Sequence, residues 1–204
     1  MDQPMGDLHF WFMSLGLRIR DLFLPPEVIV EGIGIGPGLS VLDYGCGPGS
    51  YSIEAARRVG RAGQVYALDI LPLAIRRVEK IVSRKGLTNI KTICSNCATK
   101  LPEGCIDVVL FYDTLHALEH PEGVLKELHR VLRPGGTLSV SDHHLENHQI
   151  KERVTRKGLF CLKEEGRIRG KRISSFGKVP DVVVQARRGW DDSEDLGRRD
   201  RWTD

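Results

Sequence analysis

The sequence contains no run of about eighteen apolar residues, the length that a membrane-spanning helix requires. Aromatic side chains precede Arg18 and Arg20, whereas a signal peptide has a basic start followed by an apolar stretch, so we expect no signal peptide. The sequence also lacks any block of about five like charges, the usual electrostatic mark of nucleic-acid binding. These absences predict a protein with no membrane span and no nucleic acid partner.

The five cysteines are odd in number and lack the spacing of a disulfide framework, which fits a reducing cytoplasm as the location. Cys94 and Cys97 form a Cys-x-x-Cys pair. A structural zinc site has four ligands, and the sequence offers no second pair. We therefore interpret these two residues as ordinary buried or half-buried thiols and assign no metal ion to them.

The chain of 204 residues is long enough for one α/β core and too short for two substantial domains. Hydrophobic residues make up 41% and charged residues 28%, with a formal net charge of +3, an ordinary globular balance. We expect one domain over residues 1–186. Residues 187–204 are almost all charged or small, which predicts a disordered tail. The sequence does not decide between a monomer and a homodimer.

Apolar residues recur at three- and four-residue spacing over residues 8–23, which predicts an amphipathic helix that Pro25 and Pro26 end. A second short helix is expected to begin at Pro26. Together they would form an N-terminal helical cap over about residues 1–36.

From residue 39 onward, short apolar runs alternate with helical patterns. Strands are predicted at residues 39–44, 64–69, 90–94, 106–113 and 137–142, with helices after Gly49, from Pro72 to a cap at Gly86, and over residues 121–132. A turn is expected at residues 134–136, and "LFCL" and "VVVQA" are expected to pair as a terminal hairpin around the basic residues Arg167, Arg169, Lys171 and Arg172. The alternation predicts an α/β fold, a doubly wound, mostly parallel Rossmann-like sheet of about seven strands with helices on both faces.

Gly45, Gly47 and Gly49 follow the first predicted strand, where such sheets bind nucleotides because glycines let the ligand approach the backbone closely. Asp43 precedes these glycines, and Asp69 ends the second strand, twenty residues after Gly49. A carboxylate at that second position can accept from both ribose hydroxyls. A glycine turn alone also suits a strand-to-helix connection without a ligand, and the two acids favour a binding site.

The glycine spacing is Gly-x-Gly-x-Gly followed by Ser50, whereas the dinucleotide fingerprint has its third glycine one position later. This difference disfavours NAD. A carboxylate at Asp43 would repel pyrophosphate but can hold the amino group of an amino-acid moiety. A positively charged amino-acid nucleoside fits both observations.

Four segments, "VLDYGCGPGSYSIEAA", "VYALDI", "LPEGCIDVVLFYDTLHAL" and "LKELHRVLRPGGTLSVSD", resemble successive motifs of the class I S-adenosylmethionine-dependent methyltransferase family, in particular the ubiquinone/menaquinone-methyltransferase-like type that acts on small molecules. The resemblance covers about residues 38–142 and implies S-adenosylmethionine as the cofactor. The cofactor-binding residues that it implies are Asp43, Gly45, Cys46, Gly47, Gly49, Asp69, Ile70, Asn96, Cys97 and Asp113.

By this resemblance, Asp43 and the glycines surround the methionine portion, Asp69 binds the ribose and Ile70 flanks the adenine. The family commonly has an acid after the third strand, and the aligned residue here is Asn96. The carbonyl of an asparagine side chain still accepts a hydrogen bond from the adenine amino group, without charge assistance.

In such a fold the methyl acceptor lies over the carboxyl ends of the fourth and fifth strands. Polar residues at these ends are Asp113, His116, His120, Asp142, His143 and His144. An O–H or N–H acceptor must lose a proton, and imidazole accepts one near neutral pH. We predict His116 and His143 as the candidate catalytic residues, with packing of a helix or decoration of a loop as the alternative for each, and we expect structural roles for His120 and His129.

Asp113 and Asp142 also lie where metal-dependent, catechol-type methyltransferases place carboxylate ligands. The Asp-Asn pair of those enzymes reads Asp142-His143 here, so half of that motif is missing. We assign no metal, and Asp113 is interpreted as a residue near the cofactor.

The loop "YDTL" after the fourth strand lacks the polar-Pro-Pro-aromatic pattern of enzymes that methylate amino groups of nucleic acid bases, and the chain has no Pro-Cys nucleophile. The predicted function is therefore transfer of a methyl group from S-adenosylmethionine to an O, N or C atom of a small molecule. The alternatives are a non-catalytic S-adenosylmethionine-binding regulatory protein and an NAD-dependent oxidoreductase.

Overall fold

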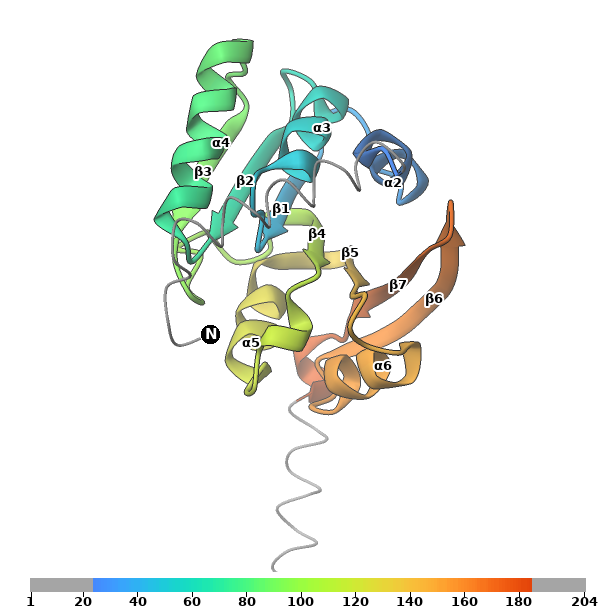
Figure 1. Cartoon of the computed structure of the whole chain (residues 1–204). Helices are drawn as coiled ribbons and strands as arrows, with labels where there is room; N and C mark the ends of the chain where they lie inside the picture. Colours follow the sequence, from blue (N-terminus) through green and yellow to red (C-terminus); the bar gives the residue numbers. More distant parts are fainter. Residues whose placement is uncertain (1–23, 185–204) are drawn as a thin grey trace, which may run out of the picture.

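Alternating strand and helix patterns give the chain a central sheet between two layers of helices (Figure 1). The computed structural model describes residues 24–184. The helix predicted over residues 8–23 and the tail predicted over residues 187–204 lie outside the described residues.

The described sheet has seven strands in the order β3-β2-β1-β4-β5-β7-β6. The strands are β1 (Ser40–Tyr44), β2 (Gln64–Asp69), β3 (Ile90–Cys94), β4 (Ile106–Tyr112), β5 (Leu132–Ser141), β6 (Phe160–Ile168) and β7 (Lys171–Lys178). Strands β1 to β5 pair in parallel, whereas β7 lies antiparallel between β5 and β6. The predicted doubly wound, mostly parallel sheet is confirmed.

The helices are α2 (Pro26–Gly32), α3 (Ser50–Val59), α4 (Pro72–Lys85), the 3₁₀ turn η1 (Leu115–Ala117), α5 (Glu122–Val131) and α6 (Asn147–Thr155). Proline occupies the first turn of α2 and of α4, where its missing N–H has no helical partner to lose. Gly86 ends α4 in the left-handed conformation at φ +62°, as its position predicted.

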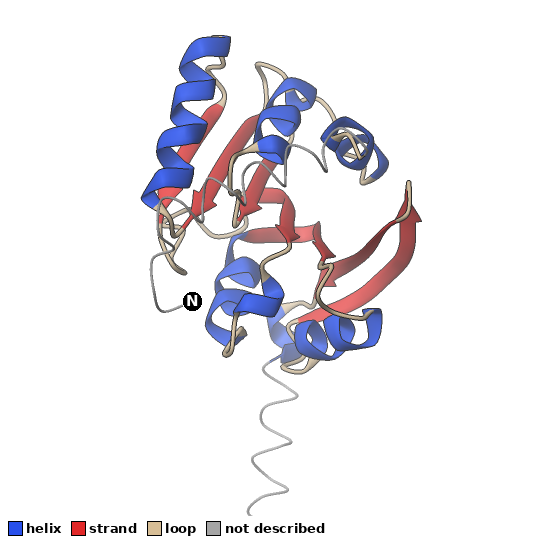
Figure 2. Ribbon diagram, viewed as in Figure 1, coloured by secondary structure: helices blue, strands red, loops and turns tan. Residues whose placement is uncertain are grey.

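Strand β4 shows how the sheet separates the two helical layers. Val108 and Leu110 pack with residues of α2 and α3, while Val109 and Phe111 pack with residues of α5 and α6. Successive side chains of a strand point to opposite faces, so a strand covered on both sides is apolar throughout. Figure 2 shows the helices on both sides of the sheet.

At the C-terminal side of the chain, one prediction differs in detail from the structure and another is wrong. The turn expected at residues 134–136 is part of β5: Ile106 pairs with Leu132 and Val108 with Thr137, so the turn is accommodated as a bulge within the paired strand. The second strand of the hairpin is β7, whereas in the segment "VVVQA" residues 182–184 are helical. Pro180 comes directly before this helical turn, and proline favours the first turn of a helix.

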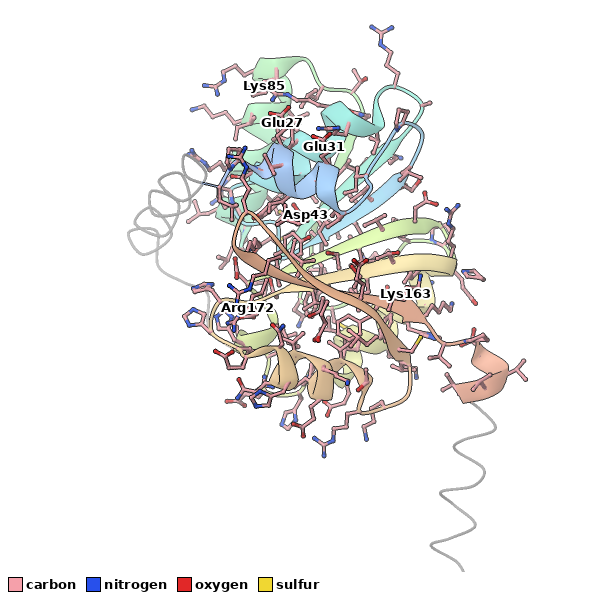
Figure 3. The ribbon with its side chains drawn as sticks, turned by 90° about the vertical axis from the view of Figure 1, so that its right-hand side faces the viewer. Glu27, Glu31, Asp43, Lys85, Lys163 and Arg172 are labelled. Atoms are coloured by element: carbon pink, nitrogen blue, oxygen red, sulfur yellow. The ribbon has the colours of Figure 1, made fainter. Side chains whose placement is uncertain are left out.

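The basic residues predicted to lie between the two hairpin strands belong largely to the strands themselves. Arg167 pairs with Arg172 across β6 and β7, and Arg169 lies at the turn with φ +45°. Figure 3 shows Lys163 and Arg172 apart from each other along this hairpin, Arg172 next to the turn and Lys163 within β6.

Among residues 24–184, no helix has the length and apolar character that crossing a membrane requires.

Candidate active site

The glycine loop between β1 and α3 directs its backbone N–H groups into the protein. Gly45 and Cys46 both donate to the carbonyl oxygen of Leu68, at 2.8 and 2.9 Å, and Gly47 donates to Oδ2 of Asp69 at 2.8 Å. The last two loop positions hold a proline, which has no N–H, and a glycine that donates back to the loop at 3.0 Å. A pyrophosphate site needs backbone donors that point at the ligand, so this loop does not suit NAD.

Asp69 ends β2 beside this loop, with 7% of its surface exposed. Its two carboxylate oxygens accept from the N–H groups of Gly47 and Leu71, each at 2.8 Å. Burial raises the pKa of this carboxyl, and the hydrogen bonds from Leu71 and Gly47 oppose that rise. Each oxygen retains a further lone pair, so the group fits the two hydroxyls of a ribose.

Asp43 lies on β1 between Ala67 and Leu110 of the neighbouring strands, near the middle of the molecule (Figure 3). Only 2% of its surface is exposed, and the hydroxyl of Ser52 donates to Oδ2 at 2.5 Å. A carboxylate held at the start of the glycine loop fits the ammonium group of an amino acid. The two acids and the glycine loop therefore have the donor and acceptor chemistry that S-adenosylmethionine requires.

A hydrogen bond from Tyr44 of β1 holds the loop after β3, where the adenine is expected to bind. The hydroxyl of Tyr44 donates to the backbone carbonyl of Asn96 at 2.9 Å, and burial raises the pKa of Tyr44 far above its ordinary value. Asn96 is exposed, while Cys97 and Ile70 are half-buried. Sequence reasoning found these three residues and missed Tyr44, because its contact joins positions far apart in the chain.

The loop after β4 packs directly on the glycine loop. A Cβ atom added to Gly45 would lie 2.2 Å from Oγ1 of Thr114. Thr114 stands between Asp113 and η1, which contains His116. This close approach brings the expected cofactor loop and the expected acceptor side together.

Two histidine–aspartate pairs form at the carboxyl ends of β4 and β5. Nδ1 of His116 lies 2.9 Å from Oδ2 of Asp142, and Nδ1 of His143 lies 2.8 Å from Oδ1 of Asp113. The side chain of Asp142 is completely buried, whereas those of His116 and His143 are 29% and 67% exposed. The structure thus brings together the residues that the sequence predicted only as separate candidates.

A third imidazole, that of His144, lies between the other two. Its ring centroid is 4.1 Å from that of His116 and 3.9 Å from that of His143. His120 is exposed, while His129 is buried and its Nε2 lies 2.8 Å from the carbonyl oxygen of Val179. The structural role predicted for His129 is confirmed.

The side chain of Lys171, the first residue of β7, also lies at the carboxyl ends of β4 and β5. Its Nζ lies 3.5 Å from Oδ2 of Asp113 and 5.0 Å from the ring centroid of Tyr112. Asp113 itself has φ +50°, an uncommon conformation for a non-glycine residue that is often found at functional sites. Sequence reasoning noticed Lys171 only as part of a basic stretch, because nothing local indicates its distant carboxylate partner.

The strand order, the inward-pointing glycine loop and the two buried acids agree with the class I methyltransferase fold. The chain belongs to the family described as "Methyltransferase domain", whose profile matches residues 35–175. The family match and the fold together define a class I methyltransferase domain.

Curated relatives agree with this assignment. The chain is 33% identical over 129 residues to a demethylmenaquinone methyltransferase of Geobacillus kaustophilus, covering 63% of this chain and 55% of the relative. It is 28% identical over 127 residues to the ubiquinone/menaquinone biosynthesis C-methyltransferase UbiE of Shewanella pealeana, covering 61% and 51% of the two chains. The chain thus spans about half the length of the curated relatives that it matches.

Solved structures share the fold. A methyltransferase from Aquifex aeolicus that depends on S-adenosylmethionine superimposes with a TM-score of 0.70 at 23% identity, covering 78% of this chain and 93% of that chain. A structure from Methanococcus maripaludis, described as a methyltransferase of the same kind, gives a TM-score of 0.72 at 16% identity, covering 88% and 98%.

Proposed function

We propose that this methyltransferase acts on a small molecule, at an O, N or C atom that gives up a proton, and that hydroxylated aromatic or quinol rings are the acceptor class. The pair of His116 with Asp142 carries the proposal, because it places an oriented proton acceptor beside the loop that contacts Gly45. The names of the curated relatives, which are quinone methyltransferases, support a ring of this class.

The reaction is a displacement at carbon. S-adenosylmethionine supplies a methyl group on a sulfonium: the acceptor atom bonds to the methyl carbon, the carbon–sulfur bond breaks, and its electron pair stays on sulfur in S-adenosylhomocysteine. The proton of the acceptor passes to imidazole and then to water. Holding the two partners in line supplies much of the rate enhancement in such a reaction.

His116 is the better placed of the two predicted proton acceptors. Asp142 accepts from the backbone N–H of His116 at 3.0 Å as well as facing its Nδ1. A carboxylate at Nδ1 assigns the proton to that nitrogen and leaves Nε2 as the acceptor. His143 has the same kind of partner in Asp113, but its side chain is 67% exposed and its orientation is less restricted.

The cofactor is proposed to lie along the carboxyl ends of β1 and β2. Asp43 binds the amino group of the methionine portion and Asp69 the ribose hydroxyls. Asn96 and Ile70 contact the adenine, by a hydrogen bond and by packing. The burial of both acids and the inward-pointing N–H groups of the loop support this arrangement.

The test is transfer of a labelled methyl group from S-adenosylmethionine to a panel of quinols, phenols and amines, with the wild type and two variants. We expect transfer to a ring hydroxyl or to a carbon next to one. His116→Gln should lower kcat by about 100-fold, the usual range for loss of a proton acceptor, with unchanged cofactor affinity. His120→Gln is the matched control, because His120 is exposed and belongs to neither of the two histidine–aspartate pairs.

Two outcomes would contradict the proposal. Full activity of His116→Gln would remove His116 from the reaction. Tight cofactor binding without transfer to any acceptor in the panel would favour the alternative, a regulatory protein that binds S-adenosylmethionine.

A further inference from the structure

The carboxyl ends of β4 and β5 hold a group of side chains with the composition of a metal site. One potential ligand atom from each of Asp113, Asp142 and His143 lies within 4.8 Å of the other two. Ligands about 2.1 Å from one ion are separated by at most about 4.2 Å, so small side-chain movements bring the three atoms to bonding distance. We propose that these three residues bind a divalent transition-metal ion.

The two carboxylates are already held by surrounding donors. Oδ1 of Asp142 accepts from the backbone N–H of His144 at 3.0 Å, and Oδ2 faces His116. Oδ1 of Asp113 accepts from the backbone N–H of His143 at 3.2 Å, and Nζ of Lys171 lies 3.5 Å from Oδ2. Outer hydrogen bonds of this kind orient metal ligands and strengthen binding.

The charge balance also favours a cation. Asp113 and Asp142 contribute two negative charges, and Lys171 contributes one positive charge, 3.5 Å from Oδ2 of Asp113. The other oxygen of Asp113 faces His143. The donors to Asp142 within the described residues are two backbone N–H groups and the imidazole of His116, so Asp113, Asp142 and Lys171 together keep a net negative charge when the imidazoles are neutral.

The ligand types select the class of ion. His143 supplies an imidazole nitrogen, and the rings of His116 and His144 lie within 6.1 Å and 3.9 Å of it, centroid to centroid. Imidazole suits Zn²⁺, Co²⁺, Ni²⁺ and Fe²⁺, whereas Mg²⁺ and Ca²⁺ prefer sites made of oxygen alone. The inference is therefore a mixed nitrogen and oxygen site for the first group.

This inference does not rest on the proposed acceptor, and it leaves His116 outside the ligand set. Metal binding is measured on the protein alone, with neither S-adenosylmethionine nor an acceptor present. A failed acceptor screen and a failed metal titration are thus separate results.

The experiment is a titration of the full chain, without an affinity tag and stripped with a chelator, with Co²⁺ and Zn²⁺. Visible absorption reports ligation of Co²⁺ by protein side chains, and elemental analysis after gel filtration gives the amount of Zn²⁺ retained. We expect about one equivalent of either ion and no comparable binding of Mg²⁺. His143→Gln and Asp142→Asn should each weaken Co²⁺ binding by at least about tenfold.

The control is His148→Gln, which removes an exposed imidazole of α6 that is not part of the group. It should bind Co²⁺ as the wild type does. The proposal is overturned if the wild type shows no saturable binding, or if His143→Gln binds as tightly as the control. Because the side chain of His143 is 67% exposed, this variant should fold even if Asp142→Asn does not.

Discussion

Replacing Gly45 by alanine tests the contact between the cofactor loop and the loop after β4. The new Cβ atom would lie 2.2 Å from Oγ1 and 3.2 Å from Cγ2 of Thr114, in a residue with φ +79°. The left-handed conformation costs about 1–2 kcal/mol for alanine, and the crowded contact adds about 1–3 kcal/mol. We expect a loss of about 2–5 kcal/mol, which lowers Tm by about 4–20 °C in a domain of this size.

A matched variant separates the two contributions. Gly38 has nearly the same backbone conformation, φ +81°, but a Cβ atom there would have no neighbour within 4 Å among residues 24–184. Gly38→Ala should therefore lose only the conformational part, about 1–2 kcal/mol. In the double variant Gly45→Ala/Thr114→Ala the two crowding atoms are absent, although the hydrogen bond from Thr114 to the carbonyl of Tyr112, 2.9 Å long, is lost as well.

The assays are thermal unfolding and calorimetric titration with S-adenosylmethionine. Gly45→Ala should weaken cofactor binding as well as stability, while Gly38→Ala should affect stability alone. Adding Thr114→Ala to Gly45→Ala should cost less than Thr114→Ala costs in the wild type, because the second substitution removes the clash that the first one creates. Equal destabilisation by Gly45→Ala and Gly38→Ala would refute the close packing of the two loops.

Three further predictions concern other residues. Asp69→Ala should weaken S-adenosylmethionine binding by about 10- to 100-fold in calorimetry, because hydrogen bonds to a charged group contribute about 1.5–3 kcal/mol; unchanged affinity would contradict the proposed ribose contact. Tyr44→Phe should weaken binding several-fold with little loss of Tm, since it frees the loop after β3. The side chain of Arg130, together with Thr99, lowers the pKa of Glu127 from 4.5 to about 2. Because the pKa of Glu127 in the folded state lies below its value in the unfolded state, the charged carboxylate stabilises the fold above pH 4.5. This stabilisation is lost as the pH falls toward 2. Glu127→Gln should therefore lower the free energy of unfolding by about 1–2 kcal/mol at pH 7 and by less at pH 3.

The cofactor half of the molecule was predictable because its signals are local. Each βαβ unit contains its own apolar run, turn and helical stripe, so β3 was located to the residue at Ile90–Cys94. The glycine loop with its flanking acids is also contained in a short segment. Local patterns therefore sufficed for the strands and for the glycine loop.

The C-terminal half depended on contacts that no local pattern records. The segment "VVVQA" is more apolar than β7, but only β7 lies where it can pair with both β5 and β6. The sequence predicts each histidine only as a separate candidate. Their pairing with Asp113 and Asp142 depends on the contact between the ends of β4 and β5, which no local pattern indicates. Lys171 became part of the site for the same reason.

The reversed direction of β7 separates the segments proposed to choose the acceptor from those proposed to bind the cofactor. Because β7 runs against β5, its first residues lie at the carboxyl ends of the parallel strands, and Lys171 after the β6–β7 turn approaches Asp113, where the acceptor is proposed to bind. Under the proposed function, a change of sequence in that turn alters which molecules are methylated, while Asp43 and Asp69, the acids proposed to bind the cofactor, lie far earlier in the chain and stay as they are. The turn is thus the natural place to diversify acceptor choice, in evolution or by engineering.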